Sequence, residues 1–210
     1  MSYHGYINFM QTYLQQIEKP NVIEIGVDTG ATLIPLVQFL SRTKNQFNFD
    51  AVDVLLQEPL AIMLKNLLLQ QDSQRVLFTI QNSLEYLKTT AVENKREYHL
   101  ALVDGDHNYY TVSNELELLH PMMSESSIII CDDYHGRWSE RDLFYSTRVG
   151  YENNPIATKP VIMEKQGVKL AVDDFLNTHQ DWKMIQVKGE PVVLIRGNVK
   201  LEVMNEDSPE

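Results

Sequence analysis

The sequence is poor in cysteine and in long apolar runs, and each shortage excludes a class of protein. A single cysteine, Cys131, in 210 residues excludes a disulfide framework and is compatible with a reducing compartment. Cys131 lies inside an apolar run, so we expect a core residue and not a nucleophile. No apolar run approaches the roughly 20 residues of a membrane-spanning helix, and residues 1–5 lack the basic region of a signal peptide. We therefore expect a cytoplasmic protein without a membrane partner.

Positive charge is also scarce. The chain has 18 lysine and arginine residues against 29 aspartate and glutamate residues, which gives a net charge of −11. A nucleic-acid partner is disfavoured, because contacts with phosphates need a basic surface. Part of the acid excess lies in residues 202–210, which we expect to form a frayed, solvated tail.

The length and pattern indicate one α/β domain over residues 1–210. Hydrophobic residues make up 43% of the chain, and helix-like and strand-like segments alternate. Apolar residues three and four apart predict a helix over 6–18, within an N-terminal helical region 1–20. Short apolar runs predict strands at 22–26, 47–54, 75–80, 99–103 and 127–131 with helices between them, and a hairpin of strands at 182–187 and 191–196.

The turn after the first predicted strand has the spacing Glu24-x-Gly26-x-x-x-Gly30. Gly26 permits a sharp turn and the close approach of a ligand, and Gly30 lets the next helix start near it. The free amides at the start of that helix favour an anionic group. Asp53 ends the second strand, where an acid is placed to bind ribose hydroxyls; a loop or capping role is the alternative.

Two polar residues, Asn82 and Ser83, follow the third predicted strand. They are equally suited to contact an adenine edge and to cap the helix that follows. Ser83 is a good capping residue, because its hydroxyl can accept a hydrogen bond from a free amide of the first turn.

Carboxylates follow the fourth and fifth predicted strands. Both strands are continuous apolar runs, typical of a parallel sheet buried on two faces. If the strands are neighbours, the carboxylates meet at one edge and repel one another unless a cation lies between them. A hard divalent metal suits such oxygen ligands, and the sequence does not separate magnesium from manganese. The acids concerned are Asp104, Asp106, Asp132 and Asp133.

The segment 136–166 has no helical or strand periodicity over most of its length. Long irregular segments inside compact domains are usually functional or mobile. We expect an insertion over the active site that shapes acceptor binding, with a solvated loop as an equal alternative. The candidate contacts within it are Arg137, Trp138, Arg141, Tyr145 and Arg148.

Together these motifs resemble a known family. Residues 24–30, Asp53, the loops 103–107 and 131–134, and the helix 167–176 are similar to class I S-adenosylmethionine-dependent methyltransferases. The resemblance is greatest to the metal-dependent O-methyltransferase branch, with the macrocin-type antibiotic sugar enzymes and the cephalosporin hydroxylase group. It implies a Rossmann-like sheet of seven mostly parallel strands, an antiparallel C-terminal hairpin and helices on both faces.

The resemblance also implies roles for individual residues. The methionine part of the cofactor would contact Glu24, Gly26 and Gly30, with Asp53 on the ribose and Asn82 and Ser83 near the adenine. Asp104, Asp132 and Asp133 would ligate magnesium, and Asp104 would also border the cofactor. The resemblance does not extend to the 136–165 segment, so it does not identify the acceptor.

A metal-bound acceptor explains how such a site would work. The metal lowers the pKa of a bound hydroxyl and orients it, which suits a sugar, a vicinal diol or a catechol. Asp106 is the first candidate for the base and His107 the second, the latter for its natural pKa.

Three other functions remain open. The chain could methylate nitrogen or a carboxylate without a metal, or bind a nucleoside without turnover. A dinucleotide-dependent oxidoreductase is disfavoured, because Gly-x-x-x-Gly differs from the spacing that seats a pyrophosphate. The sequence is compatible with a homo-oligomer and does not determine the oligomeric state.

Overall fold

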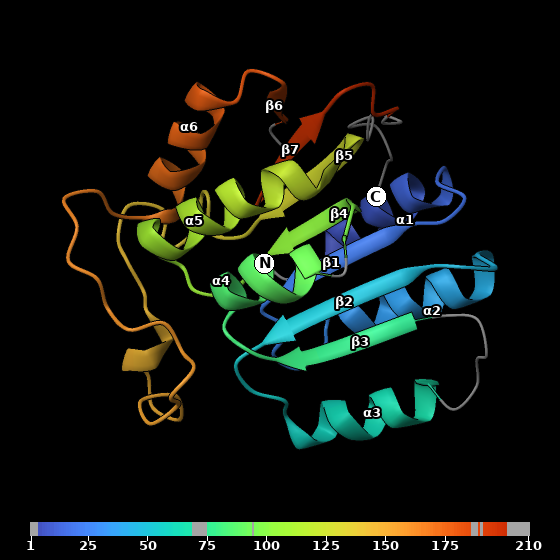
Figure 1. Ribbon diagram of the computed structural model, residues 1–210, viewed down its shortest axis with the longest axis horizontal. Helices are drawn as coiled ribbons and strands as arrows, with labels where there is room; N and C mark the ends of the chain where they lie inside the picture. The colour runs from blue at the N-terminus through green and yellow to red at the C-terminus, as the bar shows by residue number, and fades with distance from the viewer. Residues whose placement is uncertain (1–3, 69–74, 94, 186–188, 190, 201–210) are drawn as a thin grey trace, which may run out of the picture.

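A computed structural model describes residues 4–68, 75–93, 95–185, 189 and 191–200. It contains a seven-stranded sheet with helices on both faces (Figure 1). The strands are β1 Asn21–Ile25, β2 Asn48–Asp53, β3 Arg75–Ile80, β4 Tyr98–Val103, β5 Met123–Cys131, β6 Trp182–Ile185 and β7 Val192–Arg196. The helices are α1 His4–Gln15, α2 Leu33–Thr43, α3 Glu58–Leu68, α4 Ser83–Tyr86, α5 Tyr109–Leu119 and α6 Val168–Thr178.

The sheet has the order β3-β2-β1-β4-β5-β7-β6. Strands β1 to β5 pair in parallel, and β7 is antiparallel to both of its neighbours. The predicted sheet of seven mostly parallel strands with an antiparallel C-terminal hairpin is confirmed. The predicted strand 182–187 ends at Ile185, and its last two residues lie outside the described residues, as does the predicted tail 202–210.

Two apolar layers hold the helices against the sheet. On one face, α4, α5 and α6 pack on side chains of the central strands, and Cys131 is fully buried there, as predicted. On the other face, α1, α2 and α3 pack on the alternate side chains of the same strands. No helix in the described part of the chain is long and apolar enough to cross a membrane.

The strand register brings the ends of the central strands to one edge. Ile25 of β1 pairs with Val103 of β4, and Val103 pairs with Cys131 of β5. Residues that follow these strands therefore emerge side by side. The arrows of β2, β3 and β4 point toward the side where the irregular segment after β5 lies (Figure 1).

A buried ion pair involves Asp50, three residues before the carboxyl end of β2. Asp50 is 1% exposed and accepts hydrogen bonds from the Tyr98 hydroxyl at 2.9 Å, while Arg96 Nε lies 2.9 Å from its carboxylate. The guanidinium thus supplies the counter-charge that a buried carboxylate needs.

We expect Asp50→Asn to lower the free energy of unfolding by about 3–5 kcal/mol, because it leaves a buried guanidinium without its partner. Tyr98→Phe is the matched control; it removes one hydrogen bond and should cost about 1 kcal/mol. Urea denaturation measures both. Equal costs for the two variants would contradict the assigned role of the ion pair.

Candidate active site

A cavity of about 440 Å³ opens at the carboxyl edge of the parallel strands. This volume is within the range of small-molecule sites. Its floor comes from the residues that follow β1, β2, β3 and β4. Its outer wall comes from the irregular segment after β5, through Tyr145, Arg148, Val149, Tyr151, Ala157 and Thr158.

Gly26 lets two backbone segments approach closely in the floor of the cavity. It has a φ of +81°, and a Cβ atom there would lie 2.1 Å from the Asp104 carbonyl oxygen. Any other residue would push the β1 turn away from the β4 loop. Gly30 acts elsewhere: a Cβ atom on it would lie 2.6 Å from Leu60 Cδ1, so it serves the packing of α3, and it does not line the cavity.

Two acids flank the glycine turn. Asp53 lines the cavity, and its carboxylate accepts hydrogen bonds from the Val27 amide at 2.8 Å, the Asp28 amide at 3.0 Å and the Leu55 amide at 3.0 Å. Asp53 therefore fixes the turn as well as presenting a carboxylate. Glu24 is 4% exposed, its Oε2 has no hydrogen-bond partner among the described residues, and burial raises its pKa well above the usual range, with Asp53 adding to the rise.

Asn82, and not Ser83, caps helix α4. The Asn82 side chain accepts hydrogen bonds from the Leu84 and Glu85 amides, and Asn82 has the extended backbone of a cap residue. Its Nδ2 also donates to the Ile156 carbonyl and to Thr158 Oγ1, each at 3.0 Å. Ser83 is already the first helical residue, which is why the capping role considered for it is wrong; its hydroxyl donates to Glu115. Both residues line the cavity.

The two acidic loops converge, as expected for neighbouring parallel strands. Donor atoms of Asp104, His107 and Asp132 all lie within 4.8 Å of one another. His107 Nε2 is 3.8 Å from Asp104 Oδ1. Its other ring nitrogen, Nδ1, is 3.2 Å from Asp133 Oδ2. The carboxylate of Asp133 thus lies on the Nδ1 side of the imidazole, and that of Asp104 lies on the Nε2 side.

Burial shapes the charges of this cluster. It raises the pKa of Asp132, an effect that His107 opposes and Asp133 reinforces. It also lowers the pKa of His107, which the neighbouring acids oppose. A carboxylate held in such surroundings is stabilised by a cation that binds among the acids. The donor set therefore fits a divalent metal.

Asp106 lies on a different wall of the cavity. Its Oδ1 accepts a hydrogen bond from the Tyr145 amide at 2.7 Å, and burial raises its pKa to about 6. The two candidate bases are thus separated: His107 is among the metal-ligand candidates, and Asp106 holds the segment that covers the cavity.

The irregular segment 136–166 is tied to the protein core at several points. Asp142 accepts hydrogen bonds from the Tyr109 and Gly167 amides, and the Leu143 amide donates to the His107 carbonyl. Of the five predicted contacts, Tyr145 and Arg148 line the cavity. The guanidinium groups of Arg137 and Arg141 lie over the ring of Trp138, outside the lining, at 4.8 and 4.9 Å from its centroid.

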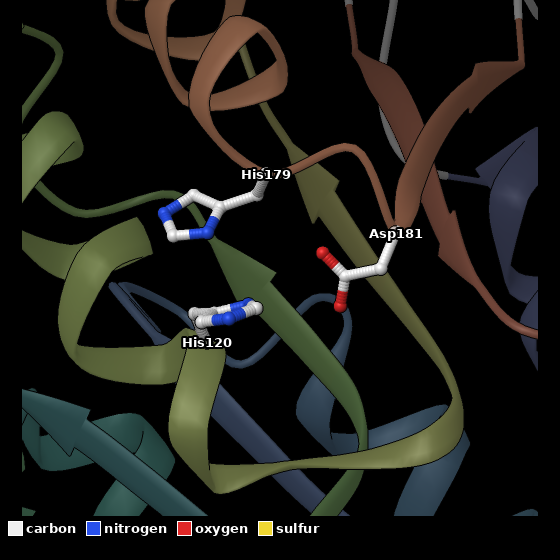
Figure 2. Close-up of side chains that lie close together, drawn as sticks. All are labelled: His120, His179 and Asp181. Atoms are coloured by element: carbon white, nitrogen blue, oxygen red, sulfur yellow. The ribbon is translucent and has the colours of Figure 1, made fainter.

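A second cluster of His120, His179 and Asp181 lies at the opposite edge of the sheet (Figure 2). Each member is already paired. Trp182 Nε1 donates to His120 Nδ1 at 3.0 Å, His179 Nε2 lies 3.1 Å from the Glu117 carboxylate, and Arg196 Nε lies 2.8 Å from Asp181. Because Arg196 brings a positive charge and Trp182 occupies a ring nitrogen, we interpret this cluster as packing between α5, α6 and β6.

The strand order with its antiparallel β7, the glycine turn after β1 and the acid at the end of β2 agree with the class I methyltransferase fold that the resemblance implies. The family model described as a methyltransferase domain matches residues 23–134, and the chain belongs to this family. The prediction that the chain is a class I methyltransferase, and therefore an enzyme, is confirmed. None of the curated proteins matches the chain significantly.

Solved structures of methyltransferases share the fold. The chain is similar to apo CalS11, a TDP-rhamnose 3′-O-methyltransferase of calicheamicin biosynthesis, with a TM-score of 0.61 and 15% identity over 92% of this chain and 78% of that chain. The chain is also similar to MycE of the mycinamycin pathway, solved with Mg, SAH and mycinamycin VI. The TM-score is 0.55 and the identity 13%, over 98% of this chain and 50% of that chain. For SAH-bound PaMTH1 of Podospora anserina, the TM-score is 0.54 and the identity 14%, over 94% of this chain and 80% of that chain.

The buried carboxyl of Glu115, beneath the cavity, should make the stability of the protein depend on pH. Glu115 of α5 is 0% exposed, its Oε2 has no hydrogen-bond partner in the described part of the chain, and burial raises its pKa from 4.5 to about 8. The folded protein therefore favours the protonated carboxyl. In the unfolded chain the carboxyl has its usual pKa and loses its proton at lower pH than in the folded protein. The free energy of unfolding therefore falls as the pH rises from about 4.5 through about 8.

We expect Glu115→Gln to remove this dependence, because the amide keeps the shape and cannot ionise. Relative to the wild type, the variant should gain on the order of a few kcal/mol between pH 5 and pH 9. Urea denaturation at both pH values measures the difference. Parallel stability profiles for the two proteins would show that Glu115 does not titrate as assigned.

Proposed function

We propose that this protein is an S-adenosylmethionine-dependent, divalent-metal-dependent O-methyltransferase that acts on a hydroxyl of a small molecule. The observation that carries the proposal is the meeting of Asp104, His107 and Asp132, with donor atoms within 4.8 Å, beside a glycine-floored cavity. Membership of the methyltransferase family supplies the reaction class. The acidic cluster supplies the reason to choose an oxygen acceptor and a metal.

The cavity residues fit the cofactor. Asp53 offers a carboxylate for ribose hydroxyls, and Val54 and Ala157 offer apolar walls beside Asn82 for an adenine ring. Glu24 lies outside the lining, but its buried Oε2, which has no hydrogen-bond partner among the described residues, is at the end of β1 near the turn where the methionine part would lie. Bound S-adenosylmethionine supplies a methyl group on a sulfonium, ready for transfer to a nucleophile. SAH in the MycE and PaMTH1 structures supports this choice.

The acidic cluster fits magnesium or manganese. Asp104 and Asp132 would hold the ion, and Asp133 would serve as a further ligand or hold His107 in place. A metal there would lower the pKa of an acceptor hydroxyl and fix its orientation. An acceptor with two adjacent oxygens, such as a sugar diol or a catechol, suits a hard ion with open positions. Mg in the MycE structure supports this assignment.

His107 is the better candidate for the base. Asp133 Oδ2 lies 3.2 Å from Nδ1 and favours the tautomer with the proton on that nitrogen. Nε2 then has a free lone pair on the side of Asp104 and Asp132, where it can take the proton of an acceptor hydroxyl. Asp106, the first candidate from sequence, instead holds the Tyr145 amide. We assign Asp106 to positioning of the covering segment.

Calorimetric titration with S-adenosylhomocysteine, with magnesium and with EDTA, tests the cofactor and the metal together. We expect micromolar nucleoside binding and a separate magnesium site. Asp132→Asn should abolish magnesium binding and metal-stimulated methylation of a diol and catechol panel, while nucleoside affinity stays within a few-fold, because Asp132 does not line the cavity.

Asp181→Asn is the matched control, since it removes a carboxylate from the cluster at the opposite edge. It should leave the magnesium isotherm unchanged. Methylation that persists in EDTA would instead indicate a metal-independent enzyme acting on nitrogen or a carboxylate. Binding of nucleoside without turnover on any acceptor would indicate a non-catalytic member of the fold.

We expect His107→Gln to lower the turnover number by about a hundredfold or more, the usual effect of losing a general base. Nucleoside affinity should stay within a few-fold, because His107 does not line the cofactor cavity. Methylation assays on the acceptor found in the panel, paired with calorimetry, measure the two effects. A larger loss in Asp106→Asn than in His107→Gln would reverse the assignment of the base.

A further inference from the structure

The cofactor cavity has an uneven distribution of charge. Four carboxylates line it, from Asp28, Asp53, Asp104 and Asp106. One cationic side chain, Arg148, is among the lining residues that the structure describes. An anionic group on a ligand would be repelled by most of this wall, so it has one favourable place to bind.

Arg148 is placed at the mouth of the cavity by a short turn. The helical turn Tyr145–Thr147 ends at Arg148, whose amide donates to the Tyr145 carbonyl at 2.8 Å. Its guanidinium carbon lies 5.7 Å from the centroid of the Tyr145 ring. Burial raises the pKa of Tyr145 and of Tyr151, and the charge of Arg148 opposes the rise in both, which is consistent with a guanidinium close to the two rings.

The guanidinium is available for a ligand. Among the described residues, no carboxylate forms an ion pair with Arg148, whereas Arg96 and Arg196 each pair with an aspartate. Its two neighbours in the segment, Arg137 and Arg141, lie over Trp138. Arg148 is therefore the arginine of this segment that faces the cavity and keeps its hydrogen-bond donors for another group.

The methyl donor of the proposed function has charges that match this arrangement. Its sulfonium and its ammonium group are cations, which suit a wall of carboxylates. Its methionine carboxylate is an anion, which needs a cationic partner in the same cavity. A planar guanidinium can hold a carboxylate through two parallel hydrogen bonds.

We propose that Arg148 binds the methionine carboxylate of the cofactor. This inference rests on the proposed function. It adds the residue that favours a nucleoside with an amino-acid carboxylate over one that lacks this carboxylate. Because Arg148 belongs to the segment 136–166, the bound carboxylate also ties that segment to the cofactor.

A double-mutant cycle between protein and ligand tests the contact. The two ligands are S-adenosylhomocysteine and its decarboxylated analogue, 5′-(3-aminopropylthio)-5′-deoxyadenosine, which keeps the ammonium group. Wild-type protein should bind the carboxylate-bearing ligand about tenfold more tightly, the usual scale of one charge-assisted pair. In Arg148→Gln this preference should fall to about one, with affinity for the analogue unchanged.

Arg141→Gln is the matched control, since it makes the same change in the same segment outside the cavity lining. It should keep the full preference. Arg148→Lys should keep part of it, because the charge remains and the planar fork is lost. Rising salt should weaken the preference of the wild type more than that of Arg148→Gln.

Two results would overturn the proposal, and they differ from each other. If Arg148→Gln prefers the carboxylate-bearing ligand as strongly as the wild type does, the carboxylate binds elsewhere and the proposed function stands. If the wild type binds neither ligand, the cofactor assignment fails and this inference fails with it.

Discussion

The parallel pairing of the central strands is the constraint on which the whole site depends. The hydrogen-bond ladder continues one residue beyond each strand: the Gly26 amide donates to Val52, the Asp104 amide to Ile25 and the Asp132 amide to Val103, all at 2.9–3.0 Å. The first residue after each strand is therefore held by the sheet itself. Groups that a flexible loop would leave apart are fixed at one edge, as positioned catalysis requires.

Much of this arrangement could be predicted from sequence, because it follows from local patterns. Continuous apolar runs mark strands buried on two faces, and acids directly after two such runs must meet if the strands are neighbours. The convergence of Asp104 and Asp132 needed no information beyond the strand order. The resemblance implied seven mostly parallel strands with an antiparallel C-terminal hairpin, and the order of the strands, which makes β4 and β5 neighbours, comes from the structure.

The details that sequence could not supply depend on distant contacts. Asn82 is the cap of α4 while its amide nitrogen binds residues more than seventy positions later, and nothing near Asn82 in the sequence signals those partners. The orientation of His107 depends on Asp133, which has a φ of +56°, a conformation that a pattern of residue types does not specify. The contact of Asp133 with His107 Nδ1, on which the proposed role of His107 as base rests, is therefore not readable from the sequence.

The covering segment is held against cavity residues by hydrogen bonds at several points, among them that from the Asn154 side-chain amide to the Val54 carbonyl at 2.8 Å. Asp106 holds the Tyr145 amide at one end, and Asn82 holds Ile156 and Thr158 at the other. The stretch between them is bounded by hydrogen bonds that use residues of the cofactor cavity. Substitutions in that stretch at positions that neither line the cavity nor make these hydrogen bonds can therefore be accommodated without loosening its ends, whereas changes at Arg148 or Tyr151 would alter the wall of the cofactor cavity itself.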